Sequence, residues 1–312
     1  MRTAPNSPTK DSTGKSPRPT HIMSVDVEDY FMVEAFAGTV QQSSWDSWPS
    51  RVVDNTKKIL DLFDRYHVKG TFFIVGWVAE KFPALVLDIH SRGHELACHS
   101  YWHRTVYSLT PDEFRKDTRD AVRAVEDAAG VKVHGYRAPS WSITKSCLWA
   151  LDILAEEGFT YDSSIYPIRH DLYGVPGARR FPYLQKCTNG KVLQEFPPTT
   201  VRLLGQNLPG AGGGYLRIFP MSYTNWVFRK FERDYGEQVV VYIHPWEVDP
   251  EQPRISHSLK STVRHYTGLE STAKKLETLL SHYPFESYAQ LQQSREFGLA
   301  GEKQDTELAA LK

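Results

Sequence analysis

Apolar residues follow two alternating spacings along most of this chain. Short segments that contain apolar residues, which we predict to be strands, occur at residues 22–27, 71–75, 95–99, 132–137, 160–163, 192–196, 238–244 and near 285. Between them, apolar residues recur every three or four positions, as in amphipathic helices, at residues 52–67, 79–91, 110–129, 145–157, 223–235 and 271–281. The helix at 110–129 has the clearest start, because Thr110-Pro111-Asp112-Glu113 combines a capping-box pattern with proline at the first helical position.

Strands that alternate with helices in this way predict an α/β fold. Such an alternation implies a parallel sheet with right-handed crossovers, either closed as a barrel or open. Polar residues with catalytic potential follow successive strands, which favours the barrel. Residues 166–214 interrupt the alternation with many prolines and glycines, and we expect 210–214 to be a flexible loop. We also expect a disordered tail at 1–20 and a C-terminal tail at 291–312.

Charge and composition narrow the possible partners and compartments. The 37 basic and 37 acidic residues balance, and no basic block stands out in the body of the chain, so nothing predicts binding to nucleic acid or to an anionic membrane. The three cysteines, Cys98, Cys147 and Cys187, are too few and too far apart for a disulfide framework or a cysteine zinc site. Without a long apolar run or a recognisable signal peptide, we expect a cytoplasmic protein with no transmembrane segment.

Two groups of metal-binding residue types follow predicted strands. Asp26-Val27-Glu28-Asp29 ends the first strand, and His99-Ser100-Tyr101-Trp102-His103 begins where the strand at 95–99 ends. Both groups therefore belong to the same rim of a parallel sheet. Two imidazoles and a carboxylate suit zinc or a similar divalent ion, although a histidine pair at this spacing is by itself more often incidental.

The acidic group can supply both a ligand and a base. In extended chain, Asp26 and Glu28 project to the same face, so one could bind the ion while the other takes a proton from a water molecule whose pKa the ion lowers. The alternative is an ordinary solvated loop. The third ligand stays open between Glu28 and Asp29.

With these residues in view, the chain resembles carbohydrate esterase family 4, the NodB-homology polysaccharide deacetylases. The family carries five motifs in order, which here read Asp26-Val27-Glu28-Asp29, His99-Ser100-Tyr101-Trp102-His103, Arg137-Ala138-Pro139-Ser140, Asp162-Ser163-Ser164 and Ile243-His244-Pro245-Trp246. Each motif alone is weak, but all five in order are specific. The resemblance implies a distorted (β/α) barrel of the NodB type, with a catalytic domain at 21–290 and a family-specific C-terminal part from about residue 200.

The resemblance also assigns catalytic roles. Asp26 would be the general base, and Arg137 would hold it, since a guanidinium keeps a carboxylate charged and oriented. His99, His103 and Glu28 would bind the ion, with Asp29 as the alternative because the family's adjacent Asp-Asp pair is replaced by Asp-x-Glu-Asp. His244 would be the acid that protonates the leaving amine. The expected ion is zinc, with cobalt, nickel or manganese as alternatives.

Residues beside the motifs are the candidates for substrate binding. They are Trp102, Pro139, Trp141, Asp162, Ser163, Tyr166 and Trp246. The aromatic members would form an apolar floor for a sugar ring or an acetyl methyl group. Asp162 would line the site wall and could orient His244 or the substrate.

The segments SVDVEDYF, HSYWHR, GYRAPSWSI and HPWEVDP most resemble the deacetylase branch found in exosortase-associated exopolysaccharide loci. That branch implies an N-acetylated glycan, or its lipid-linked or nucleotide-linked precursor, as the substrate. One rival is an amidohydrolase that acts on a cyclic amide or a formyl group with the same scaffold. The other is a catalytically inactive glycan-binding module, which has no need of a base, an acid and an orienting arginine together. The oligomeric state stays open.

Overall fold

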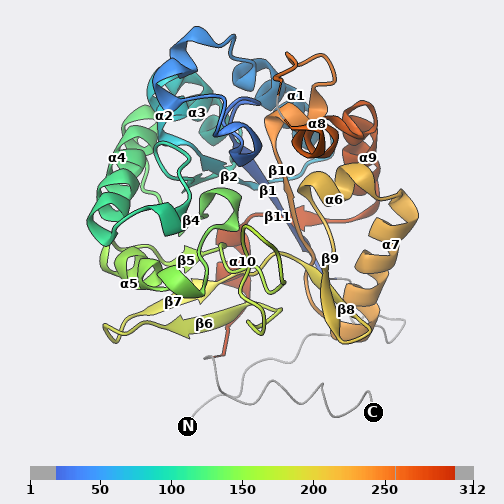
Figure 1. The fold of residues 1–312 in the computed structure, drawn as a ribbon. Coiled ribbons are helices and arrows are strands. Elements are labelled where there is room, and N and C mark those ends of the chain that lie inside the picture. Colours follow the sequence, from blue (N-terminus) through green and yellow to red (C-terminus); the bar gives the residue numbers. More distant parts are fainter. Residues whose placement is uncertain (1–18, 257, 299–312) are drawn as a thin grey trace.

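The computed structural model describes residues 19–256 and 258–298, and it has one curled sheet surrounded by helices (Figure 1). In this part of the chain nine strands pair in the order β10-β1-β2-β3-β4-β5-β7-β6, with β11 beside β1, and only β6 and β7 run antiparallel. The strands are β1 (His21–Val27), β2 (Thr71–Ile74), β3 (Glu95–Cys98), β4 (Gly135–Tyr136), β5 (Tyr161–Asp162), β6 (Tyr183–Lys186), β7 (Val192–Glu195), β10 (Val240–Ile243) and β11 (Phe285–Glu286). A separate hairpin joins β8 (Thr200–Leu203) to β9 (Gln206–Pro209).

Most helices cover the outside of the sheet, as parallel crossovers require. They are α1 (Val52–Arg65), α2 (Gly76–Lys81), α3 (Pro83–Ser91), α4 (Pro111–Ala129), α5 (Trp149–Glu156), α6 (Gly213–Ile218), α7 (Met221–Lys230), α8 (Leu259–Tyr266) and α9 (Leu269–His282). Helix α4 begins at the predicted capping box, with Thr110 as the cap and Gly130 ending the helix in the left-handed conformation. The predicted distorted (β/α) barrel is confirmed. No helix in the described residues is long and apolar enough to cross a membrane.

The last helix, α10 (Tyr288–Ser294), lies at the centre of the ring of strands (Figure 1). The Tyr288 amide donates to Thr71 Oγ1 at 3.0 Å, and the Ala289 amide donates to Glu95 Oε2 at 2.9 Å, so the start of the helix is fixed to β2 and β3. Tyr288 and Leu291 are buried there among side chains of the strands. The catalytic fold therefore continues past the boundary expected at residue 290. Residues 1–18 and 299–312 of the expected tails lie outside the described part.

A loop, rather than a strand pair, links the two ends of the sheet. In the described residues no pairing joins β6 to β10. The segment after β7 crosses this gap: Ser163 Oγ donates to the Phe196 carbonyl at 2.8 Å, and the Val240 amide donates to Thr199 Oγ1 at 2.6 Å. Two prolines in this segment lack the amide hydrogens that a regular ladder needs, which accounts for the distortion of the barrel.

Residues 166–214 contain more regular structure than the sequence predicted, since β6, β8, β9 and the start of α6 lie there. The turn of the hairpin is Leu204-Gly205, which lacks the asparagine or aspartate typical of such turns. The expectation of a flexible glycine loop at 210–214 is wrong. Gly212 has φ 90°, and a Cβ atom added there would lie 2.5 Å from Tyr242, so this glycine permits close packing against β10.

Candidate active site

The carboxyl ends of β1, β3 and β10 bring the predicted catalytic residues together. Asp26 is the second-last residue of β1, and Glu28 follows the strand directly. His99 follows β3, and His244 follows β10. Parallel neighbours in register end at the same level, so these side chains meet on one rim. Asp26, Glu28 and His99 are buried, whereas 17% of the His244 side chain is exposed.

Glu28, His99 and His103 form a cluster that fits a divalent ion. One ligand atom from each lies within 4.8 Å of the others. Glu28 Oε2 is 2.5 Å from His103 Nε2, and both side chains are buried. His103 Nδ1 has no hydrogen-bond partner in the described structure. A bound cation could replace the proton between the carboxylate and the imidazole. Three such ligands with an open position are the donor set of catalytic zinc sites.

Neighbouring groups orient two of these candidate ligands. His99 Nδ1 donates to the Arg137 carbonyl at 2.7 Å, which leaves Nε2 with its lone pair toward the cluster. Burial lowers the pKa of His99 to about 4, so the ring is neutral at physiological pH, as a ligand must be. Trp246 Nε1 donates to Glu28 Oε1 at 3.0 Å, which leaves Oε2 to face the histidines.

The loop that carries the two histidines is held in an unusual conformation. Ser100 and His103 have φ of 64° and 51°, in the left-handed region that such residues rarely adopt. Asp117 of α4 fixes this loop, since its Oδ2 accepts from Ser100 Oγ at 2.6 Å and from the Tyr101 amide at 2.8 Å. Sequence analysis did not identify Asp117, because its contacts with the loop depend on the packing of α4.

The Asp29 carboxylate does not face the histidines. It accepts hydrogen bonds from Ser50 Oγ at 2.5 Å and from the Arg51 and Val52 amides at 3.0 and 3.3 Å, at the start of α1. A carboxylate in this position satisfies helix amide groups that have no other partner. Burial nevertheless raises the pKa of Asp29 to about 6. The alternative in which Asp29 is a metal ligand is therefore corrected, and Glu28 takes that place in the cluster.

Arg137 is fully buried and holds Asp26. Its Nη1 donates to Asp26 Oδ1 at 2.5 Å and to Ser24 Oγ at 2.9 Å, while Nη2 donates to Ser163 Oγ at 3.1 Å and to the Tyr288 hydroxyl at 3.0 Å. Four acceptors from three parts of the fold, namely β1, the end of β5 and α10, leave the guanidinium one orientation. The predicted pairing of Arg137 with Asp26 is present.

His244 has a carboxylate partner that sequence analysis missed. Its Nδ1 donates to Glu247 Oε2 at 2.9 Å, and Arg217 Nε donates to Glu247 Oε1 at 2.6 Å. Burial alone would lower the pKa of His244, but the carboxylates, Glu247 first, raise it to about 9. The missed signal is local, because Glu247 lies three residues after His244 in a turn with a capping-box spacing.

Asp162 does not orient His244, which corrects that expectation. Its oxygens accept from the hydroxyl and the amide of Ser164 at 2.6 and 3.1 Å, and Asp162 and Ser163 are completely buried. Burial raises the pKa of Asp162 to about 6, and burial together with the adjacent Asp162 carboxyl raises the pKa of Glu195 well above its usual value. Both expected substrate contacts are therefore internal residues of the fold.

The aromatic substrate candidates separate into different environments. Trp141 packs edge to face on Tyr166, with ring centroids 5.6 Å apart, and its ring lies 4.7 Å from the Arg137 guanidinium, so this pair adjoins the site. Pro139 is buried at the start of the same turn. Trp246 stacks on His244 and is bound to Glu28. Its indole therefore supports the site rather than lining an apolar floor.

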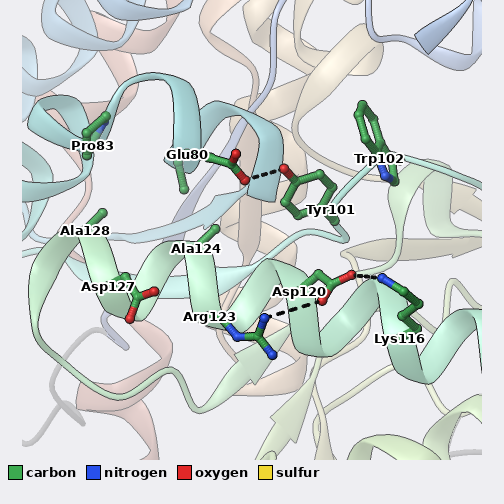
Figure 2. A pocket seen from close by; sticks show the side chains of 11 residues that line it. Glu80, Pro83, Tyr101, Trp102, Lys116, Asp120, Arg123, Ala124, Asp127 and Ala128 are labelled. Atoms are coloured by element: carbon green, nitrogen blue, oxygen red, sulfur yellow. Dashed lines mark hydrogen bonds and ion pairs between the residues drawn. The ribbon is translucent and has the colours of Figure 1, made fainter. Parts of the chain in front are cut away.

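Trp102 lies apart from the other candidates, at the margin of a hollow of about 600 Å³ beside α2, α3 and α4 (Figure 2). Several charged groups there have partners: Lys116 and Arg123 contact Asp120, and Tyr101 donates to Glu80. None of the candidate metal ligands lines this hollow. It is therefore separate from the catalytic rim.

Comparison with known proteins identifies similar sequences for most of the chain. The sequence profile of the polysaccharide deacetylase family matches residues 40–161, and that of a domain family of unknown function (DUF3473) matches 163–293. A peptidoglycan-N-acetylglucosamine deacetylase of Bacillus cereus is 32% identical over 209 residues, which are 61% of this chain and 72% of that protein. A bifunctional xylanase/deacetylase of Pseudobutyrivibrio xylanivorans is 30% identical over 111 residues, 35% of this chain but only 18% of that protein.

A solved structure supports the same architecture. The crystal structure of a polysaccharide deacetylase from Mycobacterium smegmatis, whose function is assigned only provisionally, superimposes with a TM-score of 0.56. The comparison covers 94% of each chain at 20% identity. At this identity the similarity shows a common fold.

Proposed function

This chain belongs to the polysaccharide deacetylase family, and from that premise we propose that it is a metal-dependent hydrolase that removes N-acetyl groups from an amino-sugar glycan. One arrangement supports this proposal most strongly. His244 Nε2 is 3.8 Å from both Asp26 Oδ2 and Glu28 Oε1, so a candidate base, a candidate acid and a candidate ligand surround one small volume. Binding alone does not require such a set, whereas amide hydrolysis requires each member.

The residues of this chain would divide the reaction between them. A divalent ion held by Glu28, His99 and His103 would polarise the acetamide carbonyl and lower the pKa of the attacking water. Asp26, fixed by Arg137, would take the proton of that water. His244 would deliver a proton to the leaving nitrogen, and Glu247 would stabilise the charged imidazolium until then. Trp141 remains the candidate for contact with the sugar ring, whereas Tyr166 is completely buried and supports Trp141 from behind.

Several finer expectations stay predictions. These are zinc as the native ion, a cytoplasmic location, and a substrate that is an exopolysaccharide or its lipid-linked or nucleotide-linked precursor. The family and the neutral overall charge of the chain are compatible with each of them.

Acetate release tests the proposed function directly. We expect the purified chain to release acetate from N-acetylglucosamine oligomers, to lose this activity when a chelator removes the ion, and to regain it with added zinc. Acetate can be measured on a panel of N-acetylated, N-formylated and cyclic amide substrates. Release of formate or ring opening without any acetate would favour the amidohydrolase rival, and activity that persists without metal would contradict the proposed chemistry.

Glu247→Gln should shift the pH profile in a defined direction. The carboxylate raises the pKa of His244, so its removal lowers that pKa, by roughly one to three units for loss of an adjacent opposite charge. An acid must be protonated to act, so the alkaline limb of the kcat profile should move to lower pH. At pH 8 the rate should fall roughly twofold for a shift of one unit and roughly a hundredfold for three, and at pH 6 it should fall by at most about twofold.

Asp249→Asn is the matched control for this experiment. Asp249 lies two residues further along the same turn, but its carboxylate pairs with Arg51 and Asn55. The alkaline limb of the kcat profile of Asp249→Asn should coincide with that of the unmodified protein. A Glu247→Gln profile with an unshifted alkaline limb would separate His244 from the proton-transfer step.

A further inference from the structure

The β8–β9 hairpin ends in two leucines that the fold does not bury. Leu204 is 95% exposed and Leu203 is 47% exposed. Leu203 pairs with Gln206, so the turn consists of Leu204 and Gly205, both with positive φ, 48° and 77°. The left-handed conformation is unfavourable for leucine, and exposure of its side chain offers no burial in return. Folding therefore does not explain a leucine at this position.

A third exposed leucine lies in the neighbouring loop. Leu172 is 47% exposed and belongs to the segment 166–177. This segment and β9 line one cavity of about 600 Å³, and Asn207 Nδ2 joins them by donating to the Pro167 carbonyl at 2.7 Å. The same segment leads to the catalytic rim, since Tyr173 stacks on Tyr166 with ring centroids 5.8 Å apart.

The two segments that carry these leucines are rich in arginine. Residues 167–180 and 200–209 carry four arginines and one aspartate, in a chain whose formal net charge is zero. Arg169 and Arg202 line the cavity, which no carboxylate lines, and in the described residues neither arginine has an ion-pair or hydrogen-bond partner. Sequence analysis found no basic block because these arginines come from separate segments.

We propose that the hairpin and the adjacent loop dock this protein on an anionic phospholipid surface. Leu172, Leu203 and Leu204 insert between the lipid headgroups, and Arg169 and Arg202 bind lipid phosphates. Exposed apolar tips flanked by arginines have both components of interfacial binding, apolar burial and attraction to anionic lipid. Docking in this way turns the loop beside Tyr166 toward the membrane, which suits a glycan carried at a lipid surface. The proposal does not depend on which bond the enzyme hydrolyses.

Vesicle co-sedimentation of the full chain tests this docking surface. We expect binding to phosphatidylcholine vesicles that contain about 30% phosphatidylglycerol, and weaker binding at high salt or to phosphatidylcholine alone. Leu203→Ser combined with Leu204→Ser should weaken binding at least roughly tenfold. Arg169→Gln combined with Arg202→Gln should weaken it roughly tenfold or more, on a scale of about fivefold per arginine.

Leu87→Ser is the matched control, because Leu87 is 51% exposed but lies on α3. It should bind vesicles normally, and every variant should keep its rate of acetate release from a soluble oligosaccharide. The proposal fails if the unmodified protein binds neither vesicle, or if Leu87→Ser weakens binding as much as the hairpin variant. It also fails if sedimentation velocity shows that the unmodified protein is an oligomer and the hairpin variant a monomer. The leucines would then join copies of this chain. Arginine variants that bind vesicles normally but raise KM for a phosphorylated glycan would assign the cavity to substrate instead.

Discussion

Replacing His99 and His103 together by alanine is expected to abolish turnover and to remove the divalent ion. These residues supply two of the three candidate ligand atoms, and Glu28 alone cannot hold an ion at full occupancy. The fold should survive, because both side chains lie on the rim, and we expect the free energy of unfolding to fall by only about 1–2 kcal/mol. Elemental analysis of the purified variant and its thermal unfolding check both parts of this expectation.

A buried histidine outside the cluster gives the control. His94→Ala removes a ring whose Nδ1 accepts from the Gly70 amide at 3.2 Å, and this variant should keep its ion. Glu28→Gln should weaken metal binding, whereas Asp29→Asn should not. A stoichiometric ion in the double histidine variant would show that the histidines are not ligands. Loss of the ion from Asp29→Asn but not from Glu28→Gln would return the third ligand to Asp29.

Asp26→Asn should lower kcat by roughly two to four orders of magnitude while the ion stays bound. The amide matches the carboxylate in size, so the contact with Arg137 keeps its geometry, but the amide cannot accept a proton from water. Metal content and KM should change little, because the lost interaction belongs to the transition state. Steady-state kinetics with metal analysis of the same sample separates these quantities.

Asp29→Asn is the matched control for Asp26→Asn. It makes the same chemical change three residues further along, where the carboxylate binds the start of α1, and it should keep most of the activity. Equal losses in the two variants would indicate a distorted loop rather than a missing base. Near-normal turnover of Asp26→Asn would remove Asp26 from the mechanism.

Most of the catalytic rim could be predicted from the sequence because its positions follow from one topological rule. Residues at the carboxyl ends of parallel strands must meet, whatever the details of packing. The choice between Glu28 and Asp29 could not be made in this way, since it depends on where Ser50 and the start of α1 lie. Sequence analysis allowed Asp162 to orient either His244 or the substrate, whereas a short turn brings Glu247 to His244.

The fold shows the same division between local and distant causes. Helix α4 has its stop and start signals in the sequence, and its bounds agree with the prediction. The β8–β9 hairpin lacks the expected turn residues, and α10 owes its position to Thr71 and Glu95, which lie far away in the sequence. Elements fixed by tertiary contacts leave little local pattern to recognise.

The position of Tyr288 has a consequence for the order in which the enzyme becomes competent during its synthesis. Every proposed ligand, the base and the acid leave the ribosome before α10 does, but Arg137 lacks one of its acceptors until the Tyr288 hydroxyl arrives. A nascent chain that stops short of α10 therefore carries all the reactive groups with the base only partly restrained. The helix that fills the interior of the barrel therefore also completes the set of acceptors that orients Arg137 and, through it, the base.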